Sequence, residues 1–265
     1  MSPFSLNVSK IFRSSWNNFF EEVGATAQFA ADFSKQLFFP PYETKETIKQ
    51  CYEIGYRSFP LVAITSFIIG LVLTLQSRPT LIEFGAEAWL PSMVGISIIR
   101  EIGPVITALI CAGKIGSSIG AELGSMRVTE QIDAMEVSGT NPFKYIAVTR
   151  MIATTLMVPV LVVLGDAIAL YGSYLAVNLK STITLKLYFN QVFESSDFSD
   201  AIPSIIKSYF FGFAIGLTGC YKGYNSRKGT EGVGRSANSA VVVSSLLIFI
   251  IDLIAVQITE FLGLI

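Results

Sequence analysis

Residues 92–112 read SMVGISIIREIGPVITALICA, an apolar run interrupted by two charged residues, Arg100 and Glu101. A helix needs about 20 predominantly apolar residues to cross the hydrocarbon core of a membrane. Further apolar runs of similar length occupy residues 59–76, 151–177, 203–221 and 239–262. Helices in soluble cores are rarely so long and so apolar. The sequence therefore predicts an all-α integral membrane protein with about five transmembrane helices.

The composition agrees with a membrane protein and excludes several function classes. Only 15% of the 265 residues are charged, whereas a soluble domain carries about 25%. The chain has no histidine, which excludes Ser-His-Asp and Cys-His catalysis and histidine-ligated metal sites. Cys51, Cys111 and Cys220 are scattered and form no CxxC pair, so neither a disulfide framework nor a zinc site is predicted. A net charge of −1 argues against nucleic-acid binding.

The first 40 residues differ from the rest of the chain. Residues 4–37 predict an amphipathic helix, because apolar residues recur at helical spacing. These are Val8, Ile11, Phe12, Trp16, Phe19, Phe20 and Val23. Such a helix could lie in the headgroup layer of a membrane or pack on another protein surface. It lacks the pattern of a cleavable signal peptide. We expect residues 1–40 to form this interfacial segment, Pro40-Pro41 to end it, and residues 41–265 to form the transmembrane domain.

The basic residues predict the orientation. Most Lys and Arg residues fall in three stretches, residues 1–57, 113–150 and 222–238. The loops on the other side carry only Arg78, Lys180 and Lys186. Because cytoplasmic loops are enriched in Lys and Arg, the N-terminus is predicted to be cytoplasmic and the C-terminus to lie on the opposite side.

Arg100 and Glu101 lie near the middle of their predicted helix. Each charge at that depth costs about 2.5–3.5 kcal/mol on insertion scales, so both require partners or water. Candidate partners in other predicted helices are Asp166, Lys207 and Asp252. Pro104 cannot donate a hydrogen bond to the carbonyl of Arg100, which predicts a kink beside the two charges. The charges could form an ion-pair network that sets helix register, lie nearer an interface than expected, or line a substrate pathway.

Residues 126–138 predict a short amphipathic helix between two membrane spans. Val128, Ile132 and Met135 form its apolar stripe, with Glu130, Asp133 and Glu136 elsewhere. Gly139 is expected to stop the helix, and Asn141-Pro142 to begin the next one. This helix could lie on the membrane as a connector or be presented to a soluble partner.

The run REIGPVITALICAGKIGSSIGAELGSMRVTEQIDAMEVSGTNPFKYIAVTR, residues 100–150, resembles the signature of the MlaE (YrbE-type) permeases. The part EQIDAMEVSGTNPFKYIAVTR, residues 130–150, is the most distinctive, and the resemblance extends over roughly residues 45–263. The resemblance implies a homodimeric subunit of an ABC transporter in a Gram-negative inner membrane. Each copy would engage a cytoplasmic ABC ATPase, beneath a periplasmic ring of an MCE-domain protein. Phospholipid or a related lipid would be the cargo, and a STAS-domain protein accompanies the ATPase in some systems.

The resemblance also assigns expected roles to individual residues. Glu130, Asp133, Met135 and Gly139 fall in or after the coupling helix that docks on the ATPase. A polar network near the lipid cavity would contain Arg100, Glu101, Lys207 and Asp252. Leu73, Leu81 and Ile102 would lie on its apolar wall. The chain has no GxxxxGK[ST] phosphate loop, so ATP and Mg²⁺ are expected on the partner ATPase and no cofactor in this chain.

Three other interpretations agree less well with the sequence. An ion-coupled secondary transporter would use the intramembrane charges, but the odd number of predicted spans and the missing internal repeat disfavour it. A membrane-embedded enzyme such as a lipid transferase lacks histidine and any carboxylate or cysteine cluster with metal-ligand spacing. A chloroplast relative of the same family would carry an Arg- and Ser-rich transit segment, which the sequence does not show.

Overall fold

The computed structural model describes residues 3–40, 42–179, 182–196, 198–227 and 229–263, and this part of the chain is almost wholly helical. The α-helices are α1 (Pro3–Leu37), α2 (Thr44–Glu83), α3 (Leu90–Ser97), α4 (Gly103–Cys111), α5 (Ser117–Val128), α6 (Gln131–Val137), α7 (Thr149–Asn178), α8 (Leu185–Ser195), α9 (Phe198–Tyr224) and α10 (Thr230–Phe261). Between them lie a 3₁₀ turn η1 (Glu87–Trp89) and three π-helical turns, η2 (Ile98–Ile102), η3 (Ala112–Gly116) and η4 (Phe143–Val148).

The predicted all-α membrane fold is confirmed. Within the described residues, five helical runs are long and apolar enough to cross a membrane: Thr44–Glu83, Glu87–Val128, Phe143–Asn178, Ser199–Tyr224 and Thr230–Phe261. Each contains one predicted span, except that Leu262 lies just beyond α10. The helices are longer than the apolar runs because polar turns extend them. With 40 residues α2 measures about 60 Å, twice the roughly 30 Å of the hydrocarbon core.

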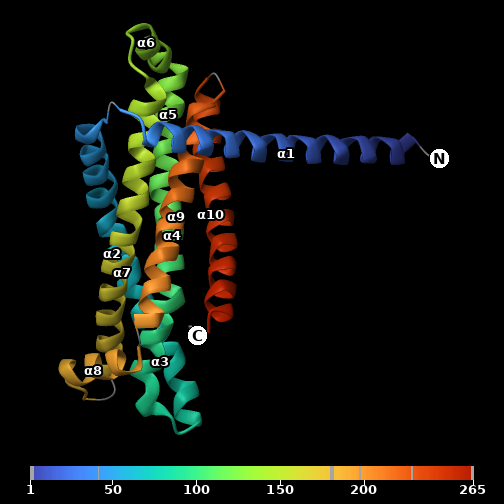
Figure 1. Ribbon diagram of the computed structural model, residues 1–265. Helices are drawn as coiled ribbons and strands as arrows, with labels where there is room; N and C mark the ends of the chain where they lie inside the picture. Colours follow the sequence, from blue (N-terminus) through green and yellow to red (C-terminus); the bar gives the residue numbers. More distant parts are fainter. Residues whose placement is uncertain (1–2, 41, 180–181, 197, 228, 264–265) are drawn as a thin grey trace.

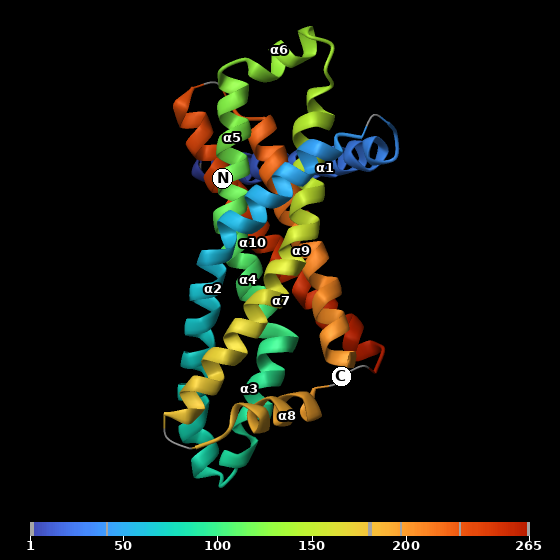
Figure 2. The same cartoon turned by 90° about the vertical axis from the view of Figure 1, so that its left-hand side faces the viewer.

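The spanning helices run side by side along one long axis (Figures 1 and 2). At one end α1 crosses the bundle and α6 projects beyond it, while α8 and the start of α3 lie at the opposite end. The second half of α1 is packed on the bundle through Phe29 and Phe33, both buried. Phe29 contacts the rings of Phe143, Tyr221 and Tyr224 edge-on. The side chains of residues 3–19 lie outside the described part, so the predicted apolar stripe from Val8 to Phe19 stays a prediction.

The outer surface of α10 is more apolar than its inner surface. Its buried residues include Ser236, Ala240 and Ser244, whereas its exposed residues are Val242, Leu246, Phe249, Ile250, Leu253, Ile254, Val256 and Ile258. A soluble protein rarely exposes an apolar patch of that extent. The arrangement is typical of membrane helices, where small residues face neighbouring helices and large apolar residues face hydrocarbon.

A seam of small and polar residues joins α2 to α7. On α2 every fourth residue is buried, from Ser58 through Ser66, Gly70 and Thr74 to Arg78. Gly70 touches the backbone of α7 so closely that a Cβ there would lie 1.9 Å from the carbonyl oxygen of Ala169. The Thr74 hydroxyl donates to Ser173 Oγ over 2.7 Å. Helix backbones thus approach closely at the seam, and side-chain hydrogen bonds hold them together.

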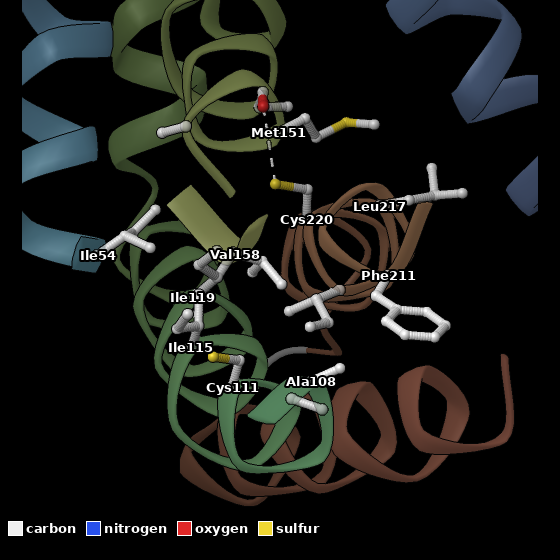
Figure 3. Close-up of a cluster of buried hydrophobic side chains, with 14 of the residues drawn as sticks. Ile54, Ala108, Cys111, Ile115, Ile119, Met151, Val158, Phe211, Leu217 and Cys220 are labelled. Atoms are coloured by element: carbon white, nitrogen blue, oxygen red, sulfur yellow. Dashed lines mark hydrogen bonds between the residues drawn. The ribbon is translucent and has the colours of Figure 1, made fainter. Parts of the chain in front are cut away.

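The largest buried apolar cluster lies where η3, α5, α7 and α9 meet (Figure 3). Cys111, Ile115 and Ile119 approach it from one side, with Met151 and Val158 of α7 opposite. Cys220 of α9 is fully buried, and its Sγ lies 3.7 Å from the carbonyl oxygen of Ala147. Both buried cysteines are free thiols and pack as small apolar side chains.

The helix α8 is not predicted from the sequence, because its residues lie between two apolar runs in an expected loop. The helix begins at Thr184, whose hydroxyl oxygen accepts a hydrogen bond from the Leu187 amide. Its buried residues Tyr188 and Val192 pack in a second apolar cluster with Leu90, Val94 and Ile98. The Tyr188 hydroxyl also donates to Ser173 Oγ over 2.7 Å, and burial raises the pKa of this phenol. The helix therefore closes this end of the α2–α7 seam.

Replacement of Gly70 by Ala should force α2 and α7 apart, because the added Cβ would overlap backbone rather than a movable side chain. We expect a loss of about 1–3 kcal/mol in the free energy of unfolding. The matched control is Gly113→Ala, where an added Cβ meets nothing within 4 Å and should leave stability unchanged or slightly raised. Unfolding followed by circular dichroism in detergent measures both. Equal stability of the two variants would contradict the close approach.

Candidate functional site

The chain between α3 and α4 departs from α-helical geometry at the two predicted intramembrane charges. Residues Ile98–Ile102 form the π-helical turn η2, and the Gly103 amide donates to the carbonyl of Ile98. Pro104 follows without an amide hydrogen, so the irregularity predicted there takes the form of a widened turn. π-Helical turns of this kind frequently occur at functional sites.

Lys207 of α9 is the centre of a charged cluster. Its Nζ lies 2.7 Å from Glu101 Oε2 on η2 and 2.8 Å from Asp252 Oδ1 on α10. Only 5% of the Lys207 side chain is exposed. A buried ammonium requires such partners, because the apolar surroundings do not solvate it. The structure thus joins Glu101, Lys207 and Asp252, three of the four charged residues that the sequence predicted to interact.

Arg100, the fourth, pairs with Asp200 at the start of α9. Its Nε lies 3.1 Å from Asp200 Oδ1, and its Nη2 donates to the same oxygen. Asp200 was not among the sequence candidates, because it precedes the predicted span of residues 203–221. The spacing of the residues could have indicated this pairing. Asp200 stands seven residues before Lys207 and therefore lies on the same helix face. Ser204, buried between them, completes that face.

Asp166, another predicted partner, does not join these ion pairs. Its Oδ1 is buried on α7 and has no hydrogen-bond partner in the described part of the chain. The carboxyl group lies against Gly103, where an added Cβ would stand 1.8 Å from Oδ1. Gly103 is therefore required for this carboxyl to pack against the π-helical turn.

The charged cluster borders a groove between α9 and α10. Arg100, Glu101, Asp200 and Lys207 line a small polar pocket. This pocket shares Lys207 with a groove of about 520 Å³ whose walls are mostly apolar. The groove is lined by Ile202, Pro203, Ile206, Phe210, Ile251, Ile254, Ala255, Ile258 and Leu262, with Ser199 and Thr259 at the shared end. A charged site thus continues directly into a long apolar one.

The apolar residues predicted with this cluster lie elsewhere in the single chain. Leu73 and Leu81 of α2 are half-buried and pack against the second apolar cluster, beside α3 and α8. Ile102 is half-buried on η2 but is absent from the walls of both hollows. A role for these three residues in lipid contact stays a prediction.

The predicted coupling helix at residues 126–138 is divided in two. α5 continues to Val128, Glu130 has a left-handed backbone (φ 57°), and α6 runs from Gln131 to Val137. The break turns α6 so that Ile132 of the predicted stripe is fully buried. Gly139 (φ 80°) ends this segment as expected, and Asn141 Oδ1 accepts from the Lys144 amide over 3.2 Å as the cap of the next helix.

The outer face of α6 is exposed at the end of the molecule where α1 lies (Figure 1). Arg127 Nη1 lies 2.6 Å from Asp133 Oδ1 and holds the turn together. Glu130 and Glu136 are exposed, and Val137 is 91% exposed. Met135 is half-buried against the main core. The segment therefore presents acidic groups and one large apolar side chain outward.

No cluster of three or more His, Cys, Asp or Glu residues that could hold a metal occurs among the described residues.

Comparison with known proteins identifies a family. The family described as Permease MlaE matches residues 47–258. An ABC transporter permease protein of Rickettsia typhi is 39% identical over 245 residues, covering 92% of this chain and 95% of that protein. A similarly named protein of Synechocystis is 35% identical, with 78% of each chain covered. The intermembrane phospholipid transport system permease protein of Haemophilus influenzae is 33% identical over 209 residues, or 78% of this chain and 80% of that protein.

Replacement of Lys207 by Met should leave Glu101 and Asp252 close together without their shared cation. We expect a loss of about 3 kcal/mol in the free energy of unfolding, the low end for breaking a buried ion pair, because Glu101 is partly exposed. Lys186→Met on the exposed surface of α8 is the control. Thermal unfolding in detergent compares them, and a Lys207→Met variant as stable as the control would show that the cluster is structurally dispensable.

Proposed function

Because this chain belongs to the MlaE permease family, we propose that it is the transmembrane permease subunit of an ABC transporter that moves phospholipid between two membranes, driven by a separate ATPase. The observation that carries the proposal is the charged cluster around Lys207, which opens into the apolar groove between α9 and α10. A phospholipid likewise combines a charged part, the headgroup, with an apolar part, the acyl chains. Arg100 and Lys207 would attract the phosphate, and the groove would hold an acyl chain.

The exposed tip formed by Glu130 and α6 supports a docking role toward the ATPase. It projects beyond the membrane-spanning bundle and presents the exposed acids Glu130 and Glu136 and the exposed side chain of Val137. We propose that the ATPase binds this tip from the cytoplasm and holds the ATP and Mg²⁺, so that this chain is not itself catalytic. Closure of the ATPases would move α6 and α5, and α5 packs on both α9 and α10, the two helices whose far ends line the groove.

The proposed assembly follows the family. Two copies of this chain would form a homodimer. An MCE-domain protein ring would stand on the periplasmic side, and a STAS-domain protein would accompany the ATPase. The distribution of Lys and Arg supports a cytoplasmic N-terminus and a periplasmic C-terminus in a Gram-negative inner membrane.

The proposal is tested by expressing the chain with its genomic neighbours, purifying through this chain and identifying bound proteins and lipids by mass spectrometry. An ABC ATPase, an MCE-domain protein and retained phospholipid are the expected result. We expect Glu101→Ala to retain less lipid, because Lys207 would then be held by Asp252 alone. Recovery of the chain without lipid and without an ATPase would favour an ion-coupled transporter instead.

Filling the groove should reduce transport without altering the charges. Ile254 is half-exposed on the groove wall, so Ile254→Trp should occupy space that an acyl chain needs. We expect ATP-dependent lipid transfer between proteoliposomes to fall by about tenfold. Leu164→Trp on the exposed surface of α7 is the matched control. Equal transfer by the two variants would exclude this groove from the lipid path.

Charge reversal at the tip tests the docking role. Glu130→Lys and Asp133→Lys together should weaken ATPase binding by about tenfold, because two carboxylates at the proposed contact become cations. Glu194→Lys on the opposite end of the molecule is the control for an exposed acid. The measurement is ATPase co-purified per chain, together with lipid transfer. Unchanged docking and transfer in the double variant would refute the assignment.

A further inference from the structure

The elbow between α1 and α2 forms a second hollow region, at the opposite end of the bundle from α8. Residues 36–40, 42 and 43 meet the start of η4 there, and Lys144 lines two hollows. One is a polar crevice of about 490 Å³ lined by Gln36, Glu43, Thr140, Asn141, Tyr145 and neighbouring backbone. The other is a groove of about 360 Å³ whose surface is mainly apolar, with Leu37, Ile48, Val148 and Ile152 among its lining residues. Gln36, Glu43 and Lys144 belong to both.

Lys144 is a buried cation whose charge is not balanced by a neighbouring acid. Its exposed fraction is 8%. Its Nζ donates to the carbonyl of Phe39 and stands 5.6 Å from the centre of the Tyr42 ring. Within the described part of the chain no carboxylate oxygen lies within 4.0 Å of this nitrogen. An ammonium has three donors and is costly to bury without an anion, so the site is suited to an anionic group from outside the chain.

The surroundings of Lys144 indicate where that anion comes from. Phe38, Phe39 and Tyr42 are 76%, 67% and 61% exposed, and they surround the elbow. Exposed aromatic residues of this kind gather where a membrane meets water. α1 runs across the bundle at this level, as a helix lying in the headgroup layer would. The apolar groove continues along α2 and α7, whose axes lead into the membrane.

We propose that the elbow binds one phospholipid of the adjoining leaflet, with a headgroup that carries both a phosphate and an ammonium. The phosphate pairs with Lys144, and the ammonium lies toward Glu43, the carboxylate common to both hollows. One acyl chain lies in the groove beside Ile48 and Ile152. This inference rests on the proposed function only in placing α1 at the membrane surface. The site is separate from the Lys207 cluster, with which its lining shares no residue.

A lipid at the elbow would connect the interfacial helix to the docking segment. Asn141 Nδ2 already donates to Gln36 Oε1 over 3.3 Å, and Lys144 to Phe39, so α1 and the turn after α6 meet at this point. A bound headgroup adds contacts to both sides of that junction. The lipid would therefore stabilise the position of α1 relative to α6.

The test is a lipid titration of the full-length purified chain in mild detergent, followed by native mass spectrometry without ATP or partners. Phosphatidylethanolamine, phosphatidylglycerol and phosphatidylcholine with identical acyl chains are compared. We expect phosphatidylethanolamine to bind most tightly and Lys144→Gln to weaken it by about tenfold. Lys144→Arg should restore most of the affinity, and Glu43→Gln should remove the preference over phosphatidylglycerol. Equal affinity in the wild type and Lys144→Gln would overturn the proposal.

Further variants separate binding from folding. Ile48→Trp fills the groove from an exposed position, so it should weaken binding without touching Lys144, whereas Ile64→Trp, exposed on α2 outside both hollows, should not. Equal lipid affinity in the Ile48→Trp and Ile64→Trp variants would also overturn the proposal. Displacement of the lipid by millimolar inorganic phosphate would overturn it as well, because it would indicate a site for a free anion. Lys207→Gln should leave phospholipid binding at the elbow unchanged, even if this variant loses lipid transfer. Lipid binding therefore tests the elbow site, and lipid transfer tests the proposed function.

Discussion

In a bilayer the hydrocarbon around a helix is as apolar as a leucine side chain, so helices gain little from burying large apolar residues against one another. Two other interactions hold the helices of this chain together: the close approach of helix backbones and hydrogen bonds between polar side chains. Gly70 against Ala169 illustrates the first, and the hydrogen bonds that join Thr74, Ser173 and Tyr188 illustrate the second. Large apolar side chains are left on the outer faces, most clearly along α10. The positions of α3, α8 and α9 follow from the seam between α2 and α7.

The same constraint explains the charged cluster. Lys207 can be buried only because η2 and α10 each bring a carboxylate to it, and the half-buried Arg100 pairs with Asp200 of α9. These pairs set the register of three helices, so the structural and the transport interpretations of the charges are compatible. The π-helical turn at Ile98–Ile102 orients adjacent residues toward different partners, Arg100 toward Asp200 and Glu101 toward Lys207. The same ion pairs border the apolar groove between α9 and α10.

The two ends of the molecule have different structures and suit different tasks. The end with α1 and α6 carries exposed aromatic and acidic residues, and Lys144 joins α1 to the turn after α6 there. α5 begins beside the core of the bundle and continues to Val128 just before α6, so it connects that end to α9 and α10. Because α5 is continuous to this point, displacement of the tip would reach α9 and α10 through packed side chains.

The sequence alone determined the helical membrane fold, the five spans and the family, because apolar runs of bilayer length and the motif at residues 130–150 are local signals. It also indicated that Arg100 and Glu101 need partners, with Asp166, Lys207 and Asp252 as candidates, since charges at membrane depth are costly without them. It did not indicate that Arg100 pairs with Asp200 or that Asp166 packs against Gly103, because each pairing depends on how distant helices are rotated and shifted. The break at Glu130, the helix α8 and the elbow around Lys144 likewise emerged only from the tertiary structure. Their conformations are decided by contacts between segments far apart in the chain, which no local pattern of residues records.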